Sequence, residues 1–253
     1  MTAENAIKTD EKKQHFDDIY VAENPVPFKE RILDDLDYIS DNHNRDTFNR
    51  LIRPWVVAQG DREVPYVDLC CCFGNTTLAI GHQMSTEEIR KNWKDAAAAQ
   101  VALKPRALPF KSTGIDISAS ALAYGANAGI FDQTIQVDLN HPTPQTSAAV
   151  QNALSGADVL VSTASLVYLD LDAIEKWVDA FAEAPREGYA MVNFLNPFSL
   201  DKADATKRIL LRRLDFVGSA ATRHRRLSPL EQSNYPGEDW ALLEIWVLKR
   251  RAK

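Results

Sequence analysis

Short β-rich runs alternate with stretches of helical spacing through the middle of the chain. Five such runs cover residues 64–72, 113–117, 134–139, 158–162 and 189–194, and each is followed by a helix candidate. Apolar runs of this length, bounded by turn residues, are typical of buried strands. Strands that alternate with helices pair in parallel, with helices covering both faces of the sheet. The alternation therefore predicts an α/β fold with a doubly wound, mostly parallel sheet.

The last part of the chain departs from this alternation. Two strand-like runs, 216–227 and 240–248, flank a turn-rich stretch at 228–237 and predict a C-terminal antiparallel hairpin. These runs bring the expected sheet to seven strands. The sequence before the first strand predicts an N-terminal helical extension over residues 1–60, followed by a sheet domain over residues 61–253.

Three polar residues have the placement of helix N-caps. Ser85 is followed by Glu88 in the spacing of a capping box, which predicts a helix over 86–102. Ser118 and Asp172 each precede a stretch of apolar residues at helical spacing. We expect these two stretches to pack against the sheet.

Composition narrows the function classes. The chain has 45% hydrophobic and 25% charged residues, and no apolar run approaches the ~18 residues of a membrane span. Its formal charge of -6 argues against nucleic acid or an anionic membrane as the main partner. The polar start lacks the apolar core of a secretory signal, so we expect a cytoplasmic protein. A small molecule is the expected partner, and the oligomeric state is left open.

The cysteines and histidines predict neither a disulfide framework nor a metal site. Cys70, Cys71 and Cys72 are adjacent, and neighbouring side chains on a strand point to opposite faces. The five histidines are scattered, without CxxC or HExxH spacing. We expect the cysteines to pack at the end of a buried strand and expect no metal cofactor.

The residues that leave the first strand are the first candidates for a site, because doubly wound sheets bind ligands at the carboxyl ends of their strands. The segment 68–77, DLCCCFGNTT, resembles motif I (DLGCGTG) of the class I S-adenosylmethionine (SAM)-dependent methyltransferases. Asp68 and Gly74 match, whereas Cys70 and Cys72 replace two glycines that allow close backbone approach. The resemblance implies that all four contact SAM. The two thiols must either point away from the ligand or narrow its pocket.

Later segments continue the resemblance in the expected order. Asp116 and Ile117, in TGIDIS, match the second motif, whose acidic residue binds the ribose hydroxyls. Asp138 and Leu139, in QVDLN, match the third, which holds adenine. Ser162 ends the fourth, whose strand lies beneath the sulfonium. No GxGxxG is present, and Asp116 lies too far beyond Gly74 for a dinucleotide site, so NAD is disfavoured.

The N-terminal segments FDDIY (16–20), NPVPF (24–28) and LDYI (36–39) resemble a subset of these enzymes that has DLCCSYG in motif I. In many methyltransferases an N-terminal helix folds over the cofactor and presents an aromatic residue to it. The resemblance therefore nominates Phe16 and Tyr20 as lid residues, with packing of an amphipathic lid as the alternative role.

Three carbon atoms are bonded to the sulfonium of SAM, and each is electrophilic. The reaction depends on which of them has a nucleophile placed in line behind it. The segment after the fourth predicted strand is neutral, so we expect a nonionic pocket in which the Tyr168 ring faces the sulfonium through a cation–π contact. Polar candidates by location are Asn140, Asn193, Asn196 and Ser199.

Three functions remain open. The first is methyl transfer from SAM to a small acceptor. The second is cyclisation of SAM itself to azetidine-2-carboxylate with release of methylthioadenosine, because the chain looks somewhat like the bacterial azetidine-2-carboxylate synthases. The third is SAM binding without turnover, suggested by the cysteines in motif I.

Overall fold

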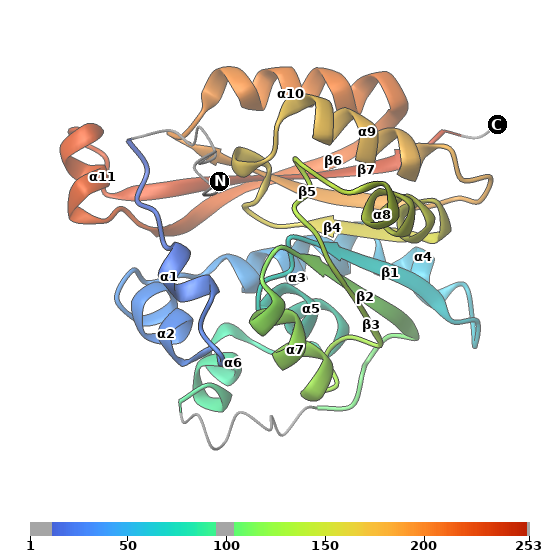
Figure 1. Cartoon of the computed structure of the whole chain (residues 1–253), viewed down its shortest axis with the longest axis horizontal. Helices are drawn as coiled ribbons and strands as arrows, with labels where there is room; N and C mark the ends of the chain where they lie inside the picture. The colour runs from blue at the N-terminus through green and yellow to red at the C-terminus, as the bar shows by residue number, and fades with distance from the viewer. Residues whose placement is uncertain (1–11, 95–103, 252–253) are drawn as a thin grey trace.

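The computed structural model describes residues 12–94 and 104–251. Within these residues, seven strands form one sheet in the order β3-β2-β1-β4-β5-β7-β6 (Figure 1). The strands are β1 (Val64–Leu69), β2 (Phe110–Asp116), β3 (Gln133–Gln136), β4 (Val159–Ser162), β5 (Tyr189–Asn196), β6 (Leu214–Arg226) and β7 (Trp240–Arg250). Neighbours from β3 to β5 pair in parallel, and β7 runs antiparallel to both β5 and β6. The predicted Rossmann-like α/β fold with a C-terminal hairpin is confirmed.

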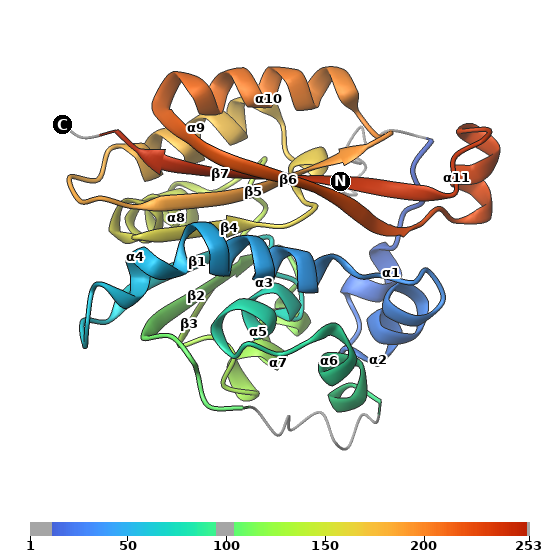
Figure 2. The same ribbon diagram turned by 180° about the vertical axis from the view of Figure 1, so that it is seen from behind.

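Helices cover both faces of the sheet. One face carries α8 (Pro144–Gly156), α9 (Leu171–Ala182) and α10 (Leu200–Arg213). The other carries α3 (Ser40–Leu51), α4 (Arg53–Val57), α5 (Asn75–Gly81), α6 (Thr86–Asn92) and α7 (Ala119–Asn127) (Figure 2). α9 shows why: Ile174, Trp177 and Phe181 recur at helical spacing and are buried against the sheet. No helix in the described part of the chain is both long and apolar enough to cross a bilayer.

The N-terminal segment forms short helical pieces, α1 (Asp17–Tyr20), α2 (Val26–Phe28) and a π-helical turn (Lys29–Asp34). Its aromatic side chains pack with Phe73 and Trp93, outside the sheet core. The Ile39 N–H donates to the His224 carbonyl at 3.0 Å, which ties the end of this segment to β6. By contrast, Phe48 and Val56 belong to the core beneath the sheet. The division at residue 60 stays a prediction.

Three local predictions differ from the structure. β1 ends at Leu69 rather than Cys72, because Cys70 has a positive φ of 59° that no strand accommodates. α6 forms its predicted Ser85–Glu88 capping box but ends at Asn92, since Trp93 turns into the aromatic core. Residues 95–102 of that predicted helix lie outside the described residues.

The third difference concerns the start of α9. Asp170, not Asp172, occupies the N-cap position of α9, and its side chain makes no capping bond there. Ser118 does cap α7, as predicted, by accepting from the Ala121 N–H. The turn-rich stretch contains a helix, α11 (Pro229–Asn234), which begins with a Ser228–Glu231 capping box.

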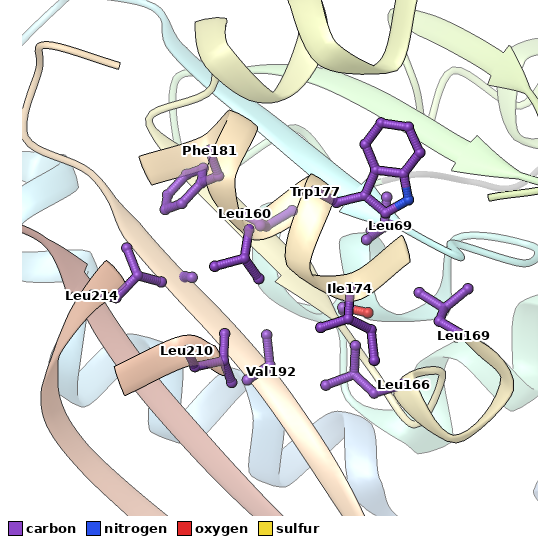
Figure 3. Close-up of a pocket in the computed structure, with 13 residues that line it drawn as sticks. Leu69, Leu160, Leu166, Leu169, Ile174, Trp177, Phe181, Val192, Leu210 and Leu214 are labelled. Atoms are coloured by element: carbon purple, nitrogen blue, oxygen red, sulfur yellow. The ribbon is translucent and has the colours of Figure 1, made fainter. Parts of the chain in front are cut away.

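A small pocket between α9, α10 and the sheet belongs to the core (Figure 3). Its volume is about 20 Å³, and the side chains around it, such as Leu69, Trp177 and Leu210, are almost all apolar. A gap of this size and polarity leaves room for little more than one water, so it is a packing defect and not a ligand site.

Candidate functional site

A second cavity, of about 440 Å³, lies at the carboxyl ends of β1 to β4. Its wall comes from the turn after β1, from the residues that follow β2, β3 and β4, and from the N-terminal segment, with two further residues from β6. Small-molecule sites occupy about 300–1,000 Å³ and favour this edge of doubly wound sheets. The cavity is therefore the candidate functional site.

The turn after β1 is held in a strained conformation. Cys70 and Cys72 have φ of 59° and 49°, in the left-handed region that favours glycine. Both residues line the cavity, and their side chains pack against two different hydrophobic clusters. Burial raises the pKa of both thiols, which keeps them protonated and poorly nucleophilic at neutral pH.

Asp116 connects this turn to the end of β2. Its Oδ2 accepts from the Cys72 N–H at 2.8 Å, and its Oδ1 accepts from the Ser118 N–H at 2.8 Å. The side chain is only 8% exposed and lines the cavity, and burial raises its pKa. The Ile117 N–H also acts on this carboxylate, which can accept about four hydrogen bonds in all and so retains some capacity toward a ligand. Ile117, 56% exposed, lies at the cavity rim.

The residues after β3 also reach the cavity. Asp138 and Leu139 both line it, and Asp138 Oδ1 accepts from the Asn140 N–H at 2.9 Å. Asn140 lines it too, but its amide is engaged at both ends. It donates to the Tyr168 carbonyl at 3.0 Å and accepts from the Asp170 N–H at 2.8 Å. Its contacts are those of a residue that positions the loop carrying Tyr168.

The lid residues nominated from the sequence lie on the cavity wall. Phe16 is buried there, and Tyr20 is half-buried, with its ring 6.1 Å from that of Phe28. The Tyr20 carbonyl accepts from the Ser118 hydroxyl at 2.5 Å, which fixes α1 over the end of β2. Tyr168 faces the same cavity from the loop after β4.

Four predicted site residues do not line this cavity. Asp68 is buried beneath the turn and accepts from the Thr77 hydroxyl at 2.7 Å; burial raises its pKa to about 7. Gly74 caps α5 with a φ of 85°, and a Cβ there would lie 2.8 Å from Ile130. Both residues shape the turn from within the fold.

The other two residues, Ser162 and Asn193, belong to β4 and β5. Ser162 is buried with its hydroxyl 2.5 Å from that of Ser165, and only Ser165 lines the cavity. Asn193 is buried and donates to Asn44 Oδ1 at 3.3 Å. The neighbouring candidates Asn196 and Ser199 also lie outside the cavity wall.

The expectation of a nonionic pocket is wrong. Lys13 and Arg225 both line the cavity and are only 5% and 3% exposed. Arg225 forms a bidentate pair with the buried Glu231, at 2.7 and 2.8 Å. The Lys13 ammonium contacts the Tyr168 hydroxyl and lies 4.6 Å from the centre of that ring. Both cations come from segments that are remote in sequence from the four motifs. The motifs therefore did not indicate that charged side chains would line the cavity.

A β-bulge explains how Arg225 reaches the wall. The register of β6 against β7 shifts between Arg223 and Arg225, and His224 and Arg225 are both buried although they are adjacent. Bulges commonly redirect side chains next to functional sites. His224 also lines the cavity, with Nδ1 2.5 Å from the Ser40 hydroxyl. Burial and the nearby Arg225 lower its pKa well below the ordinary value, so the imidazole is neutral at pH 7.

Within residues 12–94 and 104–251, no group of three or more His, Cys, Asp or Glu side chains has the arrangement of a metal site. The expectation of a metal-free site stays a prediction.

Comparison with known proteins yields structural likeness only. The chain matches no protein-family model and no curated protein. It is similar to magnesium protoporphyrin IX methyltransferase from Synechocystis PCC 6803 with bound SAM, at 11% identity over 83% of this chain and 80% of that chain, with a TM-score of 0.47. It is also similar to TehB from Haemophilus influenzae, at 12% identity over 82% and 67% of the two chains (TM-score 0.44). The doubly wound α/β fold of this chain rests on its own strand order.

Proposed function

We propose that this chain binds SAM in the cavity and transfers its methyl group to a small-molecule acceptor. The observation that carries the proposal is the convergence of Asp116 and Asp138 on one cavity whose first turn is anchored to Asp116. Acidic residues at successive strand ends, beside a tight strand-to-helix turn, suit a nucleoside with ribose hydroxyls and an exocyclic amine.

In this assignment, Asp116 accepts hydrogen bonds from the ribose hydroxyls and Asp138 accepts one from the adenine amine. Leu139 and Ile117 supply apolar surface for the adenine ring, and both line the cavity. When bound, SAM would supply an electrophilic methyl group on a sulfonium. Holding the acceptor in line behind that methyl group is the main contribution that the chain can make to the rate.

The protein's own residues also set the environment of transfer. Phe16 and Tyr20 place aromatic side chains on the part of the wall that the N-terminal segment supplies. The lone pair of the acceptor atom forms a bond to the methyl carbon while the bond between that carbon and sulfur breaks. The electron pair of the broken bond stays on sulfur. His224 lies on the wall, but burial, Arg225 and Lys13 lower its pKa and make it a weak base, so the acceptor's proton is released to water.

A second candidate function has support from the buried cations. In cyclisation, the α-amine of SAM attacks its own γ-carbon, the carbon–sulfur bond breaks, methylthioadenosine leaves, and the new ring nitrogen loses a proton. The amine must be uncharged to attack. Lys13 and Arg225 line the cavity, and a nearby positive charge disfavours a protonated amine. The product would be azetidine-2-carboxylate.

One experiment separates these functions and the third possibility, binding without turnover. Purified full-length protein is incubated with SAM, with and without a mixture of small acceptors, and the products are resolved by chromatography. Methyl transfer predicts S-adenosylhomocysteine only when acceptors are present. Cyclisation predicts methylthioadenosine and azetidine-2-carboxylate from SAM alone. Bound SAM with neither product would indicate a binding protein, and absence of SAM binding would contradict all three.

A further inference from the structure

The Lys13 ammonium determines how the Tyr168 hydroxyl is oriented. A protonated lysine has donors and no acceptor, so the contact between them requires Tyr168 Oη to accept. The phenol's own hydrogen must then point away from Lys13. Burial raises the pKa of Tyr168, so the group remains a phenol at neutral pH. Because Tyr168 lines the cavity, it is a candidate donor to a ligand there.

Two buried positive charges stand behind this donor. Lys13 and Arg225 line the same end of the cavity, and both lie within 6 Å of the Phe16 ring, at 5.8 and 5.5 Å. Glu231 takes both terminal nitrogens of Arg225 but does not line the cavity. The acidic Asp17 faces solvent at the rim. Burial of charged side chains is costly, and sites that bind oppositely charged ligands are where it is commonly retained.

From this geometry we propose that Lys13, Tyr168 and Arg225 form a subsite for a carboxylate. Tyr168 donates a hydrogen bond to one carboxylate oxygen, and Lys13 supplies the positive potential, because Glu231 already balances the charge of Arg225. The aromatic rings around them exclude water and strengthen that attraction. This carboxylate subsite rests on the proposed function only in one respect, namely that the bound nucleoside is SAM. The carboxylate belongs either to the methionine part of SAM or to a second ligand.

The first arm of the test compares SAM with decarboxylated SAM by calorimetry. If the carboxylate is that of SAM, the wild-type protein binds decarboxylated SAM at least about tenfold more weakly, as expected for loss of a charge-assisted hydrogen bond. Lys13→Met and Tyr168→Phe then weaken SAM binding and reduce this discrimination. Both variants bind methylthioadenosine, which has no carboxylate, as the wild type does.

The second arm tests a carboxylate that comes from another ligand. Benzoate and its neutral analogue benzamide are titrated into the protein, with and without saturating S-adenosylhomocysteine. In this case the wild type binds benzoate at least about fivefold more tightly than benzamide, and Lys13→Met removes the preference. The titration without nucleoside tests the subsite even if the chain binds no SAM. Failure to bind SAM would overturn the proposed function but not the carboxylate subsite.

Controls separate the subsite from folding and from net charge. Lys12→Met removes the same charge from the adjacent exposed position and leaves both preferences intact. Arg225 is left unchanged, because its loss would strand the buried Glu231 without its partner. Thermal unfolding shows whether each variant is folded. A wild-type protein without carboxylate preference in either arm would overturn the proposal, as would preferences that persist in Lys13→Met and Tyr168→Phe.

Discussion

The backbone N–H of Cys72 lies 2.8 Å from Oδ2 of Asp116, so a single carboxylate joins the turn after β1 to the end of β2. The same carboxylate accepts from the Ser118 N–H at the start of α7. Asp116 thus fixes two loops of the cavity wall while its side chain faces the cavity. A substitution at Asp116 is therefore expected to alter both loops.

Glycine at position 72 is expected to give a more stable protein than alanine. Cys72 has a φ of 49°, where a β-carbon costs about 1 kcal/mol. Urea denaturation should therefore give Cys72→Gly a higher free energy of unfolding than Cys72→Ala, by about 1 kcal/mol. At Ala128, where φ is -76°, glycine should be the less stable residue. If the difference in unfolding free energy between glycine and alanine had the same sign at positions 72 and 128, the left-handed conformation of Cys72 would be contradicted.

The buried Asp68 is expected to make stability depend on pH. Burial raises its pKa to about 7, whereas an aspartate in the unfolded chain ionises near pH 4 (about 3.9). Between these two pKa values the folded chain binds more protons than the unfolded chain. The contribution of Asp68 to stability is therefore complete below about pH 4 and is lost as the pH rises through 7. The free energy of unfolding of the wild type, relative to Asp68→Asn, should fall at up to about 1.4 kcal/mol per pH unit. Urea denaturation of the wild type and Asp68→Asn at pH 5 and 7.5 measures this difference. A difference that stays constant or grows with pH would refute the assignment.

Glu231 is expected to be a major stabilising residue. It is buried, pairs with Arg225, caps α11 and accepts from the Gln14 N–H at 3.0 Å. Glu231→Gln leaves a buried guanidinium without a counter-charge, which should cost about 3–5 kcal/mol of unfolding free energy. Glu175→Gln breaks an exposed pair with Arg212 and should cost less than about 1 kcal/mol. Equal losses in the two variants would show that the Arg225–Glu231 pair is not buried as described.

The sequence was sufficient for the sheet because strand signals are local. Runs such as the one around Val159–Ser162 are apolar and bounded by turn residues, which does not depend on the rest of the fold. Asp116 and Asp138 were named from the motifs that they resemble. Asp116 ends β2 and Asp138 lies two residues after β3, and parallel strands place their carboxyl ends at one edge of the sheet.

The cationic part of the site could not be predicted in this way. Lys13 follows another lysine in a charged stretch, and Arg225 lies in a basic run, so both resemble exposed residues. Lys13 reaches the cavity through docking of the N-terminal segment, and Arg225 through a bulge in β6. Side-chain direction was equally inaccessible: Asp68 and Asn193 lie near strand ends but turn toward Thr77 and Asn44.

Titration of SAM into the wild type and Asp116→Asn by isothermal calorimetry tests the central claim most directly. Each ribose hydrogen bond to a carboxylate contributes about 1.5–3 kcal/mol, so the account predicts one SAM bound per chain and affinity at least about tenfold weaker in Asp116→Asn. Asp172→Asn, an exposed change in α9, serves as the control and should bind as the wild type does. No binding of SAM to the wild type, or equal affinity in Asp116→Asn, would contradict it.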